Sequence, residues 1–130
     1  MTYLVDTSVI IDVLNGKQGR DALLRSLVQA GNLLACCPIN VIEVYAGMRP
    51  HQRAQTDELL SSLECYEITW EVATTAGLLK RDWARRGITL SLPDVTVAAV
   101  ALVNNLELMT DNSRHYPMPE LKLYRFPYVN

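Results

Sequence analysis

The sequence has few of the features that mark a small protein held together by disulfides or a structural metal. It contains three cysteines and no Cys-x-x-Cys pair, so neither a disulfide framework nor a zinc site is indicated. Cys36 and Cys37 are adjacent and would point to opposite faces of a strand. We expect these two and Cys65 to be small buried side chains in a reducing compartment.

Long apolar runs and an excess of basic residues are also missing. No stretch is long enough to span a membrane, and the chain does not open with a basic segment followed by an apolar one. We therefore expect a cytoplasmic protein without membrane association. The net charge is -2, which argues against a protein that coats nucleic acid through many phosphate contacts. An enzyme that handles a phosphodiester locally remains compatible with this charge.

The sequence is 49% hydrophobic over 130 residues, which is enough for a single globular domain spanning residues 1–130. Short apolar runs alternate with amphipathic segments, which predicts an α/β fold with a central, mostly parallel sheet of four or five strands. Asn40 is the expected N-cap of the third helix, and Asp94 is expected to open the last one, which is apolar almost all round. The expected strands are 3–5, 33–37, 65–69 and 106–110, with a possible edge strand at 123–126, and the expected helices are 7–14, 20–30, 40–47, 54–63, 71–86 and 95–103.

Four acids occupy the edges of apolar elements rather than solvated faces, namely Asp6, Glu43, Asp94 and Asp111. Each also has an ordinary structural explanation as a helix cap, an exposed helix acid or a turn residue. In a doubly wound sheet the first and fourth strands are neighbours, which would bring Asp6 and Asp111 to the same edge. Carboxylates packed this closely repel one another unless a cation is present. Mg²⁺ or Mn²⁺ would suit such oxygen ligands.

A metal held in this way can activate water and stabilise charge on a phosphodiester, and Thr7, Ser8 and Thr110 offer hydroxyls beside the acids. Two other interpretations stay open. The acids can be caps in a non-catalytic α/β binding module, or Asp6 can be the nucleophile of a phosphoryl-transfer domain. The second alternative usually needs a lysine after a late strand, and Lys122 is the only late lysine.

Four segments of the chain resemble the signatures of the PIN-domain family and occur in the order typical of that family. They are Val-Asp-Thr-Ser-Val-Ile-Ile-Asp (5–12), Asn-Val-Ile-Glu-Val-Tyr-Ala-Gly (40–47), Leu-Pro-Asp-Val-Thr-Val-Ala-Ala-Val-Ala (92–101) and Met-Thr-Asp-Asn-Ser-Arg-His-Tyr (109–116). Length and compactness resemble the VapC toxins of bacterial toxin–antitoxin pairs.

The resemblance implies a PIN-like α/β/α sandwich and a Mg²⁺- or Mn²⁺-dependent endoribonuclease that hydrolyses RNA with a metal-activated water. It further implies a homodimer that is neutralised by a VapB-type antitoxin and contacts DNA only through that antitoxin. Asp6, Glu43 and Asp94 take the acidic positions of the family, with Asp6 and Asp94 as the metal ligands.

The fourth acidic position of the family falls in the last motif. Asn112 occupies the slot for Asn or Asp, Asp111 lies one place earlier, and His115 stands where many relatives have Asp. We expect Asp111 to support catalysis, with Asn112 and His115 as the alternatives for this position.

Overall fold

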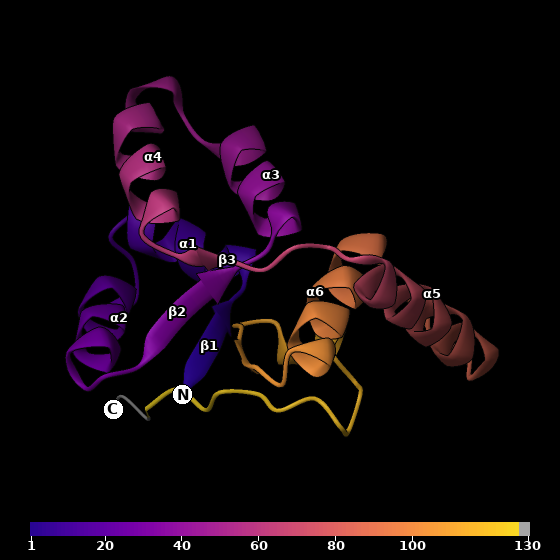
Figure 1. Cartoon of the computed structure of the whole chain (residues 1–130). Helices are drawn as coiled ribbons and strands as arrows, with labels where there is room; N and C mark the ends of the chain where they lie inside the picture. The colour runs from indigo at the N-terminus through magenta and orange to yellow at the C-terminus, as the bar shows by residue number, and fades with distance from the viewer. Residues whose placement is uncertain (128–130) are drawn as a thin grey trace.

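The computed structural model describes residues 1–127, so the last three residues of the predicted domain lie outside the described part. Four strands form one sheet, with bounds β1 Thr2–Val5, β2 Leu33–Cys36, β3 Glu64–Cys65 and β4 Glu107–Met109 (Figure 1). Their order across the sheet is β3-β2-β1-β4, and every pairing is parallel. The predicted parallel sheet, with the first and fourth strands as neighbours, is confirmed.

Consecutive residues of the strands point to opposite faces of the sheet and enter two separate hydrophobic cores. Val5 and Cys36 belong to one core, whereas their neighbours Leu4 and Cys37 belong to the other. This alternation is the period of two expected for extended backbone. It confirms that the two adjacent cysteines face opposite ways, and it means that both faces of the sheet are covered.

The helices form a layer on each face of the sheet (Figure 1). One face is covered by α1 Thr7–Leu14, α2 Arg20–Gln29, α3 Pro38–Gly47 and α4 Arg53–Ser61, and the other by α5 Trp70–Arg85 and α6 Leu92–Val103. Short 3₁₀ turns, η1 Pro50–Gln52 and η2 Ser113–His115, lie in the connections. The side chains from 97 to 101 in α6 are all buried, as its lack of a polar face predicts. No helix within residues 1–127 has both the length and the apolar character to cross a membrane.

Four helices begin earlier than predicted, α4 and α5 by one residue and α3 and α6 by more, and the two larger corrections concern residues near the candidate site. The N-cap of α3 is Cys37 rather than Asn40, whose side chain lies in the first turn and accepts a hydrogen bond of 3.0 Å from the Cys37 N–H. Pro38 fills the first helical position, where its missing N–H has no cost. The N-cap of α6 is Ser91, whose hydroxyl accepts from the Asp94 N–H at 3.2 Å. The Asp94 carboxylate is therefore not the cap of its helix.

Three predictions about the edges of the sheet need correction. The strand expected at 65–69 is the two-residue β3, because β2 ends there and offers no further partner. The edge strand expected at 123–126 is reduced to a single bridge between Leu108 and Leu123. Cys65 lies on the short edge strand and is exposed rather than buried.

The carboxyl ends of β1 and β4 lie side by side and define where the site forms. Asp6 follows β1 directly, and its backbone N–H donates to the Met109 carbonyl at 2.9 Å, which continues the pairing past the end of the strand. From β1 the chain continues into α1 on one face, whereas β4 is reached from α6 on the other face. Open parallel sheets bind ligands at such a switch point.

Candidate active site

Asp6 is the centre of the site and is almost fully buried, with an exposure of 7%. It is the N-cap of α1, and its Oδ1 accepts a hydrogen bond of 2.9 Å from the Thr7 N–H. Its Oδ2 accepts from two hydroxyls, that of Thr110 at 2.7 Å and that of Tyr116 at 3.1 Å. Three donors therefore converge on one carboxylate at the end of β1.

The electrostatics of Asp6 follow from this burial. Loss of solvent raises the pKa of the Asp6 carboxyl above its usual range, the hydrogen bonds from Thr110, Thr7 and Tyr116 oppose that rise, and the Asp94 carboxylate adds to it. Burial and the two neighbouring acids raise the pKa of Tyr116 far above its usual range, so its hydroxyl stays a protonated donor. The site thus holds buried negative charge that a cation would stabilise.

Asp94 lies beside Asp6, on the first turn of α6. The Tyr116 hydroxyl that contacts Asp6 is also 3.3 Å from Asp94 Oδ1, so a single phenol oxygen joins the two carboxylates. On the other side, His115 Nδ1 is 3.5 Å from Asp94 Oδ2. The structure therefore brings together the two residues that were predicted to bind the metal.

Glu43 is connected to Asp6 through the threonine that follows Asp6 in the chain. The Thr7 hydroxyl donates to Glu43 Oε1 at 2.8 Å and accepts from Asn40 Nδ2 at 3.1 Å. Asn40 is fully buried, so its amide holds the Thr7 hydroxyl in a fixed position. The Ser8 hydroxyl, also expected beside the acids, is buried and has no hydrogen-bond partner within residues 1–127.

Asp111, the fourth predicted acid, points into a different cluster of side chains. Its Oδ1 is 2.6 Å from Arg20 Nη2, and the Arg20 guanidinium lies 3.7 Å from the centre of the Phe126 ring. Burial and the nearby Asp111 raise the pKa of the Asp12 carboxyl. The expectation that Asp111 would meet Asp6 holds for the backbone only, because β4 lies beside β1 while the carboxylate turns toward α2.

Tyr116 and Arg20 are site neighbours that sequence reasoning did not identify. Tyr116 ends the 109–116 motif, and the available signal was a hydroxyl-bearing aromatic residue directly after His115. Arg20 gave no signal, because it lies far from Asp111 in the sequence and begins an amphipathic helix.

The donors present suit a hard divalent cation that keeps much of its water. Asp6 and Asp94 offer carboxylate oxygens that face a common hydroxyl, and Mg²⁺ is often bound through one or two carboxylates together with several waters. Among the residues described, 1–127, no group of three or more histidine, cysteine, aspartate or glutamate side chains is placed to hold a metal. The arrangement therefore fits an open site with two protein ligands rather than a closed cage.

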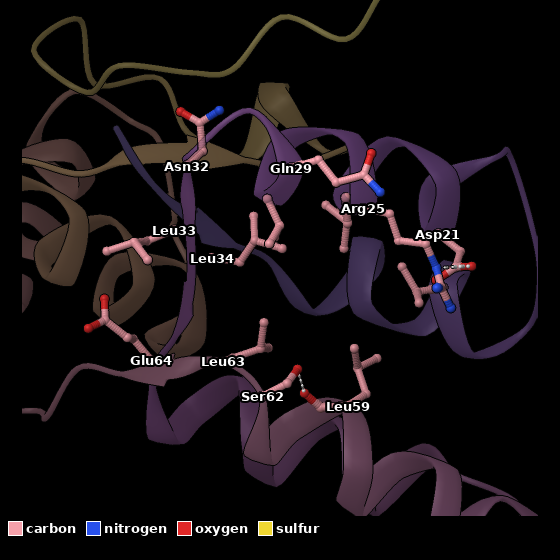
Figure 2. Close-up of a pocket in the computed structure, with 13 residues that line it drawn as sticks. Asp21, Arg25, Gln29, Asn32, Leu33, Leu34, Leu59, Ser62, Leu63 and Glu64 are labelled. Atoms are coloured by element: carbon pink, nitrogen blue, oxygen red, sulfur yellow. Dashed lines mark hydrogen bonds and ion pairs between the residues drawn. The ribbon is translucent and has the colours of Figure 1, made fainter.

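A second feature is an apolar groove between α2, β2 and α4, whose lining includes none of the four acids (Figure 2). Its volume is about 480 Å³, and Figure 2 shows Leu34, Leu59 and Leu63 facing this space. Val28, which also lines it, is 52% exposed, whereas the Leu33 side chain points away from this space in Figure 2. An apolar groove that opens to solvent beside a half-exposed valine is a candidate surface for another molecule to cover.

Comparison with known proteins identifies the family. Residues 3–121 match the family model described as PIN domain, and the chain therefore belongs to the PIN-domain family, which confirms the resemblance seen in the four motifs. Two similar proteins of Mycobacterium tuberculosis are Ribonuclease VapC19, 30% identical over 92% of this chain and 96% of the relative, and Ribonuclease VapC10, 34% identical over 90% of this chain and 87% of the relative.

Solved structures share the fold. VapBC2 of Rickettsia felis, bound to a DNA fragment from its promoter, gives a TM-score of 0.83 at 22% identity over 98% of this chain and 100% of that chain. A toxin–antitoxin complex from Klebsiella pneumoniae gives a TM-score of 0.76 at 26% identity over 92% of this chain and 94% of that chain. The predicted PIN-like α/β/α sandwich is confirmed.

Proposed function

We propose that this chain is the endoribonuclease toxin of a type II toxin–antitoxin pair, which hydrolyses RNA phosphodiester bonds with a water activated by Mg²⁺ or Mn²⁺. The observation that carries the proposal is the Tyr116 hydroxyl shared by Asp6 and Asp94, which come from distant parts of the chain. The PIN-domain match and the ribonuclease names of the relatives support it. Growth or translation would be inhibited until an antitoxin binds.

Each acid has a proposed part in this reaction. Asp6 and Asp94 would hold the Mg²⁺ or Mn²⁺, which when bound supplies positive charge to activate water and stabilise the phosphodiester. Glu43, whose Oε1 accepts from the Thr7 hydroxyl at 2.8 Å, would help to hold or orient the metal. Asp111 would support the site from its edge, where its ion pair with Arg20 sets its orientation.

The proposal is tested by removing the two carboxylate charges separately. Asp6→Asn and Asp94→Asn are expected to abolish Mn²⁺-dependent RNA cleavage and growth arrest, while circular dichroism shows that the fold is kept. Asp82→Asn is the matched control, because Asp82 is an exposed acid of α5 whose ion pair is with its neighbour Arg81. Full cleavage by both site variants would remove the basis of the proposal.

We propose a VapB-type antitoxin as the protein partner, with an amphipathic helix laid into the groove between α2 and α4. The half-exposed Val28, together with Leu34 and Leu59 in the same groove, favours such an apolar occupant. The VapBC and toxin–antitoxin complexes that share the fold support this class of partner. Val28→Glu is expected to weaken capture of a co-expressed antitoxin without changing RNA cleavage, and Asp82→Asn again serves as the control. Undiminished capture would argue against the groove.

We further propose that the toxin acts in the cytoplasm on its RNA substrate, as a homodimer, and that it contacts DNA only through the antitoxin. Sedimentation of the isolated chain tests the dimer, since a monomer across the accessible concentration range would contradict it. Electrophoretic mobility assays test the DNA contact, which should need the antitoxin.

The alternative functions make different predictions. In a non-catalytic module the acids would serve as caps, and Mn²⁺ would leave the unfolding temperature unchanged. If the carboxylate pair binds the cation, Mn²⁺ stabilises the folded chain by mass action and raises its unfolding temperature. A phosphoryl-transfer domain would use Asp6 as nucleophile beside a lysine. Within residues 1–127, Lys122 forms a hydrogen bond through its backbone carbonyl, which accepts from the Leu108 N–H at 2.8 Å. A contact between the Lys122 side chain and Asp6, which this alternative needs, is not among the hydrogen bonds of the described residues.

A further inference from the structure

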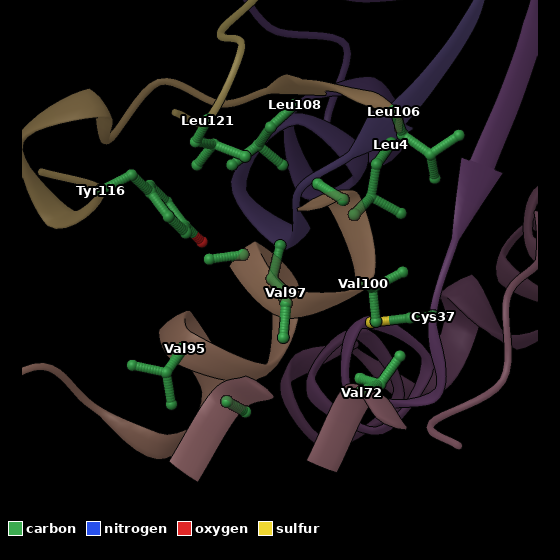
Figure 3. Close-up of a cluster of buried hydrophobic side chains, with 14 of the residues drawn as sticks. Leu4, Cys37, Val72, Val95, Val97, Val100, Leu106, Leu108, Tyr116 and Leu121 are labelled. Carbon is green, nitrogen blue, oxygen red and sulfur yellow. The ribbon is translucent and has the colours of Figure 1, made fainter. Parts of the chain in front are cut away.

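Tyr116 places one hydroxyl between the two proposed metal ligands. Its side chain is 3% exposed, and its ring belongs to the hydrophobic core under α5 and α6. Figure 3 shows the ring at the margin of this core, with its oxygen pointing toward α6, the helix of Val97. That oxygen is 3.1 Å from Asp6 Oδ2 and 3.3 Å from Asp94 Oδ1.

The two carboxylates depend on this hydroxyl to different extents. Asp6 has two further donors, the Thr7 N–H at 2.9 Å and the Thr110 hydroxyl at 2.7 Å. Within residues 1–127, the other side chain that contacts the Asp94 carboxylate is His115, at 3.5 Å, and it is half exposed. Tyr116 is therefore the buried contact that sets where the Asp94 carboxylate lies.

The Tyr116 ring is itself held in place by backbone and core. Its N–H donates to the Ser113 carbonyl at 3.0 Å in η2, and the Thr110 hydroxyl accepts from the Asn112 N–H at 3.0 Å, which shapes the same turn. Leu121 belongs to the same core cluster as the ring. A hydroxyl on such a fixed ring can hold a neighbouring ligand in its binding orientation, and interactions of this kind raise metal affinity.

We propose that Tyr116 is a positioning residue of the metal site: its hydroxyl holds the Asp94 carboxylate facing that of Asp6, so that both can bind one divalent cation. The inference rests on the proposed metal-dependent activity and adds a residue that itself contacts neither cation nor RNA. A hydroxyl has one hydrogen to donate. Two carboxylates that meet at one phenol are therefore not both satisfied by it, and negative charge remains for a cation.

Calorimetric titration with Mn²⁺ alone tests this inference. Tyr116→Phe keeps the ring and removes only the oxygen, and we expect it to raise the Kd for Mn²⁺ by about 10-fold or more, as the loss of such an indirect partner typically does. Tyr45→Phe is the matched control, because it loses a hydrogen bond of 2.6 Å to the Asp57 carboxylate elsewhere in the molecule. The control is expected to keep the wild-type Kd.

The role of Tyr116 also predicts how activity responds to the cation. At saturating Mn²⁺ the Tyr116→Phe variant should recover most of the wild-type cleavage rate, because both ligands are still present. An unchanged or lower Kd in Tyr116→Phe, together with loss of binding in Asp6→Asn, would overturn the inference and leave the proposed function standing. A wild-type chain that binds no Mn²⁺ would overturn both.

A measurement on the wild-type chain covers the case in which Tyr116→Phe does not fold. With Cζ-labelled tyrosine, the Tyr116 signal is assigned by elimination, using single Tyr→Phe variants at the other five of the six tyrosines. Titration with Mg²⁺ is expected to shift the Tyr116 signal and leave that of Tyr45 in place. Mg²⁺ binding without a shift at Tyr116 would overturn the inference.

Discussion

Thr7 and Glu43 are joined by a hydrogen bond of 2.8 Å that links the helix after β1 to the helix after β2. The same Thr7 hydroxyl accepts from the buried amide of Asn40. Thr7→Val keeps the shape of the side chain but leaves that amide without its acceptor, so we expect the free energy of unfolding to fall by about 1–3 kcal/mol. RNA cleavage should fall as well, because Glu43 loses the contact that holds it.

Thr7→Ser is the control for this prediction, since it keeps the hydroxyl and therefore both hydrogen bonds. Urea unfolding and a cleavage assay at saturating Mn²⁺ measure the two effects. If Thr7→Val matches Thr7→Ser in both the free energy of unfolding and the cleavage rate, the hydrogen bonds of the Thr7 hydroxyl contribute to neither stability nor activity.

Arg20 and Asp111 form a partly buried ion pair, with side-chain exposures of 12% and 24%. Arg20→Leu would leave Asp12 and Asp111 close together without their cation, and we expect it to lower the free energy of unfolding by about 2 kcal/mol, between the values for exposed and buried pairs. Arg25→Leu breaks an exposed pair on the same helix and should cost less than about 1 kcal/mol. Equal losses in the two variants, measured by urea unfolding, would contradict this difference.

The position of the site could be predicted from the sequence because it depends on strand order. Asp6 directly follows an apolar strand, and the parallel pairing of β1 with β4 brings the ends of these strands together. The alternation of strands and helices along the chain predicts a parallel sheet, and a doubly wound strand order makes the first and fourth strands neighbours. The proximity of Asp6 and Asp94 does not follow from strand order alone, since it depends on how α6 packs against the sheet.

The remaining site contacts depend on side-chain directions that no local pattern encodes. Asp111 turns toward Arg20, which α2 supplies from the other end of the sequence, so its backbone position alone was misleading. Tyr116 reaches Asp6 because the turn η2 and the core orient its ring. The strand expected at 65–69 was too long for a related reason, because the segment has no register partner on β2 beyond Cys65.

Asp6 predicts a pH dependence of stability in the absence of metal. Burial raises its pKa in the folded protein above the value in the unfolded chain, so between the two pKa values the folded protein binds more protons than the unfolded one. The Asp6 contribution therefore weakens the fold as pH rises through this window. Asp6→Asn lacks the charge, and its free energy of unfolding relative to wild type should increase over the same window.

Urea unfolding in the presence of a chelator, repeated across the acidic to neutral range, measures this difference. Asp82→Asn, on the exposed face of α5, should show no comparable trend. A constant or decreasing advantage of Asp6→Asn with rising pH would mean that the Asp6 carboxylate is stabilised rather than strained in the folded protein. Added Mn²⁺ should reduce the advantage, because the cation stabilises the wild-type carboxylate.

Cys36 and Cys65 are register partners on β2 and β3, yet we expect them to react differently. Burial raises the pKa of the Cys36 thiol to about 12 and also raises the pKa of Cys37, whereas Cys65 is exposed. Because the thiolate is the reactive form, iodoacetamide at mildly alkaline pH should modify Cys65 in the folded chain and all three cysteines after unfolding. Peptide mass spectrometry locates the label, and the folded Cys65→Ser variant should remain unmodified. Fast labelling of Cys36 in that variant would mean that the β3 edge of the sheet opens locally, since neither the thiolate population of Cys36 nor its access to solvent permits the reaction in the closed fold.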